Sequence, residues 1–115
     1  MSDFDVMVQE NITVIKPTTR LDQMQEKKFT KFIDKTVEDG AVNVVIDFCY
    51  LTTVSSSGLR LLMKAYKALC ACEGKMAVCS LNQNIDYLFD LVHLKRDIPI
   101  YKDANDAVEK LKARV

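Results

Sequence analysis

The stretch Ala41-Val42-Asn43-Val44-Val45-Ile46-Asp47-Phe48 is the most apolar strand candidate of this chain. A nearly unbroken apolar run of this length is typical of a strand that is covered on both faces, in the middle of a sheet. The loop Cys49-Tyr50-Leu51-Thr52-Thr53-Val54 follows and leads into Ser55-Ser56-Ser57-Gly58-Leu59. Apolar residues then recur at helical spacing from about Ser57 to Glu73. The sequence therefore predicts a central strand, a serine-rich turn and an amphipathic helix in succession.

The segments on either side of this unit alternate between strand and helix patterns. Upstream, residues 4–8 and 12–15 predict a hairpin that turns at Glu10-Asn11 and ends at Pro17, followed by a helix from Asp22 to about Asp39. Downstream, the patterns predict a strand over 76–80, a helix around 85–92, an edge strand over 98–101 and a helix over 104–111. This order predicts one α/β domain over residues 1–115, with a mixed sheet of four to five strands covered by about four helices.

Two of the predicted helices have an apolar side that we expect to face the sheet. On the helix from Asp22 to Asp39 this side consists of Met24, Phe29, Phe32, Ile33 and Val37. On the helix after the serines it consists of Leu59, Leu62, Met63, Tyr66, Leu69 and Cys70. We expect these side chains to be mostly buried against the central strand.

Charge and composition exclude several classes of protein. Sixteen basic and sixteen acidic residues give a formal net charge of zero, and hydrophobic residues make up 49% of the chain, as in a globular domain. Neither a basic excess nor a basic stripe is evident, so no nucleic-acid partner is expected. The uncharged apolar stretches are too short to span a bilayer, and the acidic start is unlike a signal peptide. We therefore expect a cytoplasmic protein without a membrane partner.

The four cysteines do not have the spacing of a metal or redox site. Cys70 and Cys72 are two residues apart in a predicted helix and point to different faces, while Cys49 and Cys79 adjoin apolar strand-like runs. There is no Cys-x-x-Cys pair, and His93 is the single histidine. We expect reduced, buried thiols, no bound metal and no cofactor.

The turn Ser55-Ser56-Ser57-Gly58 admits two interpretations. Serine is a favoured N-cap because its oxygen accepts a hydrogen bond from an amide in the first helical turn. One serine suffices for capping, which leaves further hydroxyls at a helix N-terminus, a favourable place for an anion. Gly58 is a poor helix former, which indicates either a close backbone approach or access for a partner. Composition alone leaves capping and a phosphate-related role both open.

A catalytic role for the turn is not expected. A serine nucleophile needs a base that a third group orients, and His93 falls after the third predicted helix. The turn does not have the Gly-x-Ser-x-Gly pattern, and the chain has no glycine-rich loop with Lys-Ser or Lys-Thr for a nucleotide. Asp22 and Asp47 lie near the ends of predicted elements, where Asp22 is a natural helix cap. We predict a protein that is not an enzyme; hydrolysis or nucleotide binding through Ser56 and Asp22 is the alternative.

The stretch Val44-Val45-Ile46-Asp47, with Val54-Ser55-Ser56-Ser57-Gly58-Leu59-Arg60 after the loop, resembles the signature of the STAS domain. More narrowly, it resembles the stand-alone anti-sigma factor antagonists of bacterial partner-switching systems. In that family the phosphoaccepting Ser or Thr follows an apolar residue and an Asp or Ser, and precedes a small residue, Gly and Leu. That position falls on Ser56. Ser55 stands where many members have Asp, so Ser55 and Ser57 are alternatives for the modified residue.

A second part of the resemblance lies at Thr19-Arg20-Leu21-Asp22, in the place of the family's Gly-x-Leu-Asp turn. It implies that Asp22 lies beside the phosphorylation site. Thr19 and Arg20 depart from the commoner residues of that turn. The segments 76–79 with 85–89, and 98–101 with 104–111, resemble the last two strand–helix pairs of the family, so the likeness covers nearly the whole chain.

The resemblance implies a regulator of transcription that is switched by phosphorylation. Its unphosphorylated form is expected to bind an anti-sigma factor that is also a GHKL-type serine kinase, and thereby to release the sigma factor. The kinase would phosphorylate Ser56 and block binding, and a metal-dependent serine phosphatase would restore the protein. The alternative is a STAS interaction or ligand-sensing module without a phosphorylation switch.

We expect the partner-binding surface to lie around the phosphorylation site. It comprises Asp22, Thr53, Ser55, Ser57, Gly58, Arg60 and Lys64, with Lys67 on the same polar face of the helix. Exposed cations at this place would meet acidic groups of the partner and affect the association rate more than the affinity. An ordinary solvated helix face is the alternative.

Overall fold

The computed structural model describes residues 3–40 and 43–112. Within them the strands are β1 (Phe4–Gln9), β2 (Ile12–Pro17), β3 (Asn43–Asp47), β4 (Lys75–Cys79) and β5 (Ile100–Tyr101). The helices are α1 (Glu26–Glu38), α2 (Ser56–Ala71), α3 (Gln83–Leu91) and α4 (Ala104–Lys112), with short 3-10 turns η1 (Gln23–Gln25) and η2 (Leu94–Arg96). Every predicted element is present. Ala41 and Val42, at the start of the predicted central strand, lie outside the described residues.

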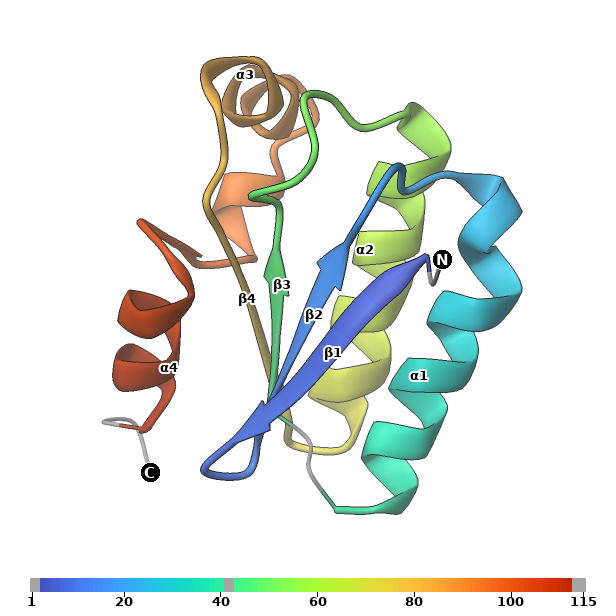
Figure 1. Cartoon of the computed structure of the whole chain (residues 1–115), viewed down its shortest axis with the longest axis vertical. Coiled ribbons are helices and arrows are strands. Elements are labelled where there is room, and N and C mark those ends of the chain that lie inside the picture. The colour runs from blue at the N-terminus through green and yellow to red at the C-terminus, as the bar shows by residue number, and fades with distance from the viewer. Residues whose placement is uncertain (1–2, 41–42, 113–115) are drawn as a thin grey trace.

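The strands form one mixed sheet in the order β1-β2-β3-β4-β5. β1 and β2 are the antiparallel arms of the predicted hairpin, and β2 to β5 run parallel. At the hairpin tip Glu10 and Asn11 both have positive φ, as a tight two-residue turn requires. α1 and α2 cover one face of the sheet and α4 covers the other (Figure 1). The predicted α/β architecture is thus confirmed, with β3 in the centre.

The core lies on both faces of β3, because this strand has helices on either side. Val44, Val45 and Ile46 are fully buried, as their apolar run predicts. Val44 and Ile46 pack towards α1 and α2, and Val45 packs towards α4. Three phenylalanines, Phe29, Phe48 and Phe89, are among the largest fully buried side chains. This two-sided core holds the carboxyl ends of β2 and β3, and the loops that leave them, in a fixed place.

The predicted apolar helix faces are correct in part. Phe29, Ile33, Leu59, Leu62 and Leu69 are buried, whereas Phe32, Val37, Met63 and Tyr66 are partly buried against the core. The prediction is wrong for Met24. The segment begins with the 3-10 turn η1 rather than with an α-helical turn, so Gln25 is buried there and Met24 is 75% exposed. Cys70 is also exposed, since Leu61 and Ala65 complete the buried side of α2 instead.

The prediction of four buried thiols is wrong for three of them. Cys79 is buried in β4, but Cys49, Cys70 and Cys72 are exposed, and all four are free. Cys49 follows the end of β3, and Cys70 and Cys72 lie at the solvent-facing end of α2, where helical spacing turns them away from the sheet. Burial, with a contribution from Asp47, raises the pKa of Cys79 to about 12. Partial burial and the same carboxylate also raise the pKa of Cys49.

We expect the thiols to react with iodoacetamide in an order that follows exposure and pKa. The thiolate is the nucleophile, so a raised pKa slows alkylation at about pH 8. Cys70 and Cys72 should be labelled first, Cys49 more slowly, and Cys79 only on unfolding. Mass spectrometry of labelled peptides over time measures this order. Rapid labelling of Cys79 in the native protein would contradict the placement of β4 inside the sheet.

Candidate functional site: the serine turn and the loop before α1

Two helix N-termini meet at one edge of the sheet. β2 and β3 are parallel neighbours, so the loops that leave their carboxyl ends emerge side by side. Residues 18–22 connect β2 to η1 and α1, and residues 48–55 connect β3 to α2. Both helices begin at this edge, and the two loops lie next to each other (Figure 1). The parallel topology therefore brings Asp22 and the serine turn together, although more than thirty residues separate them in sequence.

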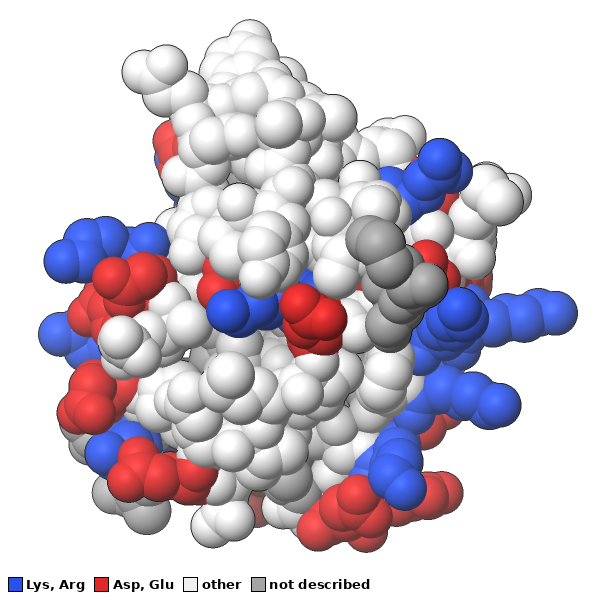
Figure 2. Space-filling model, in the orientation of Figure 1, with Lys and Arg blue, Asp and Glu red and all other residues white. Residues whose placement is uncertain are grey.

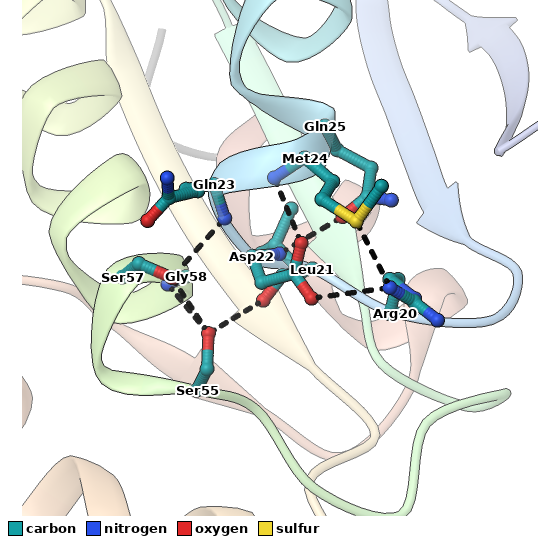
Figure 3. Close-up of polar contacts among 9 residues, drawn as sticks. All are labelled: Arg20, Leu21, Asp22, Gln23, Met24, Gln25, Ser55, Ser57 and Gly58. Carbon is teal, nitrogen blue, oxygen red and sulfur yellow. Dashed lines mark hydrogen bonds and ion pairs between the residues drawn. The ribbon is translucent and has the colours of Figure 1, made fainter.

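Ser55 is the N-cap of α2. Its Oγ accepts a hydrogen bond from the Gly58 N–H at 3.1 Å, and it donates one to the Leu21 carbonyl at 3.3 Å. The oxygens of Ser55 and Ser57 are 2.9 Å apart. Ser57 Oγ also accepts from the backbone N–H of Gln23 at 3.1 Å (Figure 3). The two outer serines thus tie the first turn of α2 to the loop before α1.

The single proton of each serine hydroxyl decides which group donates and which accepts in each of these hydrogen bonds. A serine hydroxyl has a single proton, and that of Ser55 is used on the Leu21 carbonyl. Ser57 must therefore be the donor in its hydrogen bond to Ser55. Ser55 then accepts twice and donates once, and Ser57 accepts once and donates once. The protons of both hydroxyls are therefore used in structural hydrogen bonds.

Ser56 differs from its two neighbours. It is the first residue of α2 and is exposed, as Ser55 also is, but its hydroxyl makes no hydrogen bond to any described residue. Capping of α2 and bracing of the adjoining loop therefore fall on the two outer serines. Ser55 caps the helix and Ser57 braces the adjoining loop, whereas Ser56 presents an unused hydroxyl to solvent at the positive end of a helix.

A glycine is required at position 58 because the backbone there lies very close to the backbone of Leu21. A Cβ atom at this position would lie 2.1 Å from the carbonyl oxygen of Leu21 and 2.7 Å from a methyl group of Val54. Such separations are far inside van der Waals contact, so any side chain would push the two loops apart. Of the two interpretations of Gly58 that the sequence offers, close approach is the one that the structure confirms. The same Leu21 carbonyl accepts the proton of Ser55.

Asp22 is a helix cap, as the sequence predicts. Its Oδ1 accepts from the Met24 N–H at 2.9 Å, and the Asp22 N–H donates to Oε1 of Gln25 at 3.0 Å. This is a reciprocal capping box. Arg20 lies 3.7 Å from the other carboxylate oxygen. Gln25 and the backbone of Leu21 and Gln23 are site residues that sequence reasoning missed, although Gln three residues after Asp is a recognisable capping signal.

The predicted cations beside the serines lie where α2 faces α1. Arg60 is exposed and, with Ser57 and Lys67, lines a hollow of about 490 Å³ between the two helices. Lys64 lines the same hollow and pairs with Glu26 of α1 at 3.3 Å. Thr53 is exposed in the preceding loop and does not line this hollow. The structure thus brings Ser57, Arg60 and Lys64 to one place and leaves Thr53 outside it.

The second carboxylate named from sequence, Asp47, has a structural role. It is 3% exposed at the end of β3, where Oδ1 accepts from the Cys49 N–H at 3.0 Å. Its other oxygen lies 3.9 Å from the ammonium group of Lys16. His93 is exposed after α3, with a left-handed backbone conformation before η2. Neither residue makes a hydrogen bond or an ion pair to the described serine turn.

These features define a small α/β domain with an exposed serine at a helix N-terminus, and the family model described as the STAS domain matches residues 3–107. The chain belongs to the STAS domain family. Across residues 3–40 and 43–112, no helix has the length and apolar content needed to cross a bilayer.

Three proteins of known name or structure are similar to this chain. An anti-sigma F factor antagonist of Paenibacillus polymyxa is 32% identical over 69 residues, which is 60% of this chain and 59% of that protein. The crystal structure of a candidate anti-sigma factor antagonist from Thermotoga maritima has a TM-score of 0.87 at 18% identity and covers 95% of this chain and 94% of its own. The phosphorylated form of the Bacillus cell fate determinant SpoIIAA has a TM-score of 0.72 at 20% identity, covering 94% and 98%. At these identities the two structures establish a shared fold.

Proposed function

We propose that this chain is an anti-sigma factor antagonist that is switched by phosphorylation of Ser56. The unphosphorylated form binds an anti-sigma factor and thereby releases the sigma factor. The proposal rests on the different roles of the three serines. The hydroxyls of Ser55 and Ser57 are used in structural hydrogen bonds, whereas Ser56 has an exposed hydroxyl without a hydrogen bond to any described residue. The similarity to proteins named anti-sigma factor antagonists supports the role.

We assign the modification to a partner kinase, because the sequence has no glycine-rich loop with Lys-Ser or Lys-Thr that would hold ATP on this chain. A partner kinase of the GHKL type transfers the γ-phosphoryl group of ATP to Ser56 Oγ. The bond to ADP breaks, an oxygen–phosphorus bond forms, and the hydroxyl proton passes to a base of the kinase. A metal-dependent serine phosphatase hydrolyses the phosphoserine and restores the hydroxyl. In this proposal the chain is the substrate of both reactions, acts in the cytoplasm and is not itself an enzyme.

The switch acts through charge rather than through refolding. A phosphate adds about −1.5 to −2 charges and three strong acceptor oxygens at the contact surface. On the free protein this charge is tolerated, because it lies at the N-terminus of α2 with Arg60 one helical turn away. Ser55 and Ser57 keep their hydrogen bonds, so the loops need not move. In the complex the same charge is buried against the partner, where it is poorly compensated.

The central function can be tested by sigma factor release. Adding the unphosphorylated chain to a preformed complex of the cognate anti-sigma factor and its sigma factor should displace the sigma factor in proportion to the chain added. Size-exclusion chromatography or a fluorescence change on labelled sigma factor measures the release. If the sigma factor stays bound while the chain binds the same complex, the protein is a STAS interaction module that does not antagonise the anti-sigma factor.

A further inference from the structure

Positive charge that is scattered along the sequence is gathered by the fold on α1 and α2. Residues 23–38 and 56–71 together contain seven basic and three acidic side chains, a net charge of +4. The remaining nine basic and thirteen acidic residues have a net charge of −4. The formal net charge of zero for the whole chain therefore conceals an uneven distribution of charge. Figure 2 shows Lys and Arg side chains crowded along the side of the molecule where α1 lies. The expectation that the chain has no basic stripe is wrong here, because Lys27, Lys31 and Lys35 recur at every fourth residue on the exposed side of α1.

Most of these cations have no acidic partner. Lys28 pairs with Asp3 at 3.0 Å, and Lys64 pairs with Glu26 at 3.3 Å. Among the described residues, no ion pair involves the other five, which are Lys27, Lys31, Lys35, Arg60 and Lys67. Elsewhere most cations are paired: Lys16, Arg20, Lys95, Lys110 and Lys112 each have a carboxylate within 4.0 Å. The uncompensated positive charge is therefore concentrated on this one surface.

The surface is furrowed rather than flat. The hollow of about 490 Å³ beside Ser57 and Arg60 shares Gln23 and Glu26 with a hollow of about 680 Å³ along α1, which Lys27 and Lys31 line. A smaller hollow of about 120 Å³ between the helices shares residues with both. We call these three adjoining hollows, which extend from Ser57 past Glu26 to Lys31, the cationic furrow.

We propose that the cationic furrow binds an acidic polypeptide segment of a protein partner. Its length and its unpaired cations match a chain with spaced carboxylates. The half-buried Met63 gives its lining an apolar patch that suits a peptide side chain. Glu26 and Asp34 also line it, and they would repel the evenly spaced phosphates of a nucleic acid, whereas a peptide can place a neutral residue opposite them. The inference goes beyond the serine switch, since Lys27 and Lys31 lie outside the phosphorylation site.

The test uses the full chain and a fluorescein-labelled synthetic peptide rich in glutamate with interspersed leucines, followed by fluorescence anisotropy. The wild type should bind the peptide at low ionic strength, and binding should weaken steeply as salt is added. The double variant Lys27→Glu/Lys31→Glu should raise the Kd by about tenfold or more. The matched control is Arg96→Glu/Lys102→Glu, which changes the net charge equally at two exposed residues away from α1 and α2.

The control variant should bind within about twofold of the wild type. Equal losses in the two double variants would overturn the proposal, because net charge alone would then explain the binding. Absence of binding by the wild type, or tighter binding of a single-stranded DNA of the same charge, would overturn it as well. Ser56→Ala should bind the peptide as the wild type does, so a failure of the phosphorylation proposal leaves this result unaffected.

Discussion

The phosphorylated chain is expected to bind its anti-sigma factor about 100-fold more weakly than the unphosphorylated chain. A poorly compensated charge at an interface costs about 3 kcal/mol, which corresponds to roughly this factor in Kd. The fold of the free protein should not change, since the capping and bracing hydrogen bonds belong to Ser55 and Ser57. Calorimetric titration of the two forms into the cognate anti-sigma factor measures the difference.

Variants of Ser56 separate charge from structure. Ser56→Ala should keep binding and lose little stability, near the lower end of about 0.5–2 kcal/mol, because Ser55 remains the cap. Ser56→Asp should weaken binding less than phosphorylation does, since one carboxylate has less charge and fewer acceptor oxygens. Asn105→Asp adds the same charge at an exposed position of α4, on the opposite face of the sheet, and should bind as the wild type does. Equal binding by Ser56→Asp and wild type would contradict the charge mechanism.

Gly58→Ala should be among the most destabilising single substitutions in the chain. The added Cβ would lie 2.1 Å from the Leu21 carbonyl oxygen, so the backbone of one loop has to move. That movement stretches the Ser55 and Ser57 hydrogen bonds as well. We expect a loss of about 3 kcal/mol in the free energy of unfolding, at the upper end for overpacking. Urea denaturation followed by circular dichroism measures it.

Gly40→Ala is the matched control for the glycine substitution. An added Cβ would have no atom within 4 Å there, but φ is +79°. The cost should be that of left-handed backbone alone, about 1–2 kcal/mol. A loss at Gly58 no greater than that at Gly40 would show that the loops separate without penalty. The close approach would then not be what holds the serine turn in place.

Much of the fold could be predicted because its signals are local. The apolar run that becomes β3, the Glu10-Asn11 turn and the Asp22 cap each depend on residues next to them in the sequence. The family signature is local too, and it predicts the phosphorylation site within a run of three serines. Periodicity also placed Leu59, Leu62 and Leu69 correctly on the buried side of α2. It missed Leu61 and Ala65, which are buried, and it included Cys70, which is exposed.

What the sequence did not reveal depends on contacts across space. The roles of Ser55 and Ser57 as donors and acceptors are set by the Leu21 carbonyl and the Gln23 N–H. Both are backbone groups, which every residue of their kind carries, so the sequence does not reveal them as partners. Met24 fits a helical period but lies in a 3-10 turn, so it is exposed. The cationic furrow combines charges from two helices that only the parallel crossover brings together.

The most direct test of the central claim is the position of the phosphate after incubation with the cognate kinase and ATP. Wild type, Ser55→Ala, Ser56→Ala and Ser57→Ala should be treated in parallel and analysed by mass spectrometry of the intact protein and of the peptide containing the turn. We predict one phosphate on the wild type, Ser55→Ala and Ser57→Ala, located at Ser56, and none on Ser56→Ala. Phosphate on the Ser56→Ala protein, or on no variant including the wild type, would contradict the account.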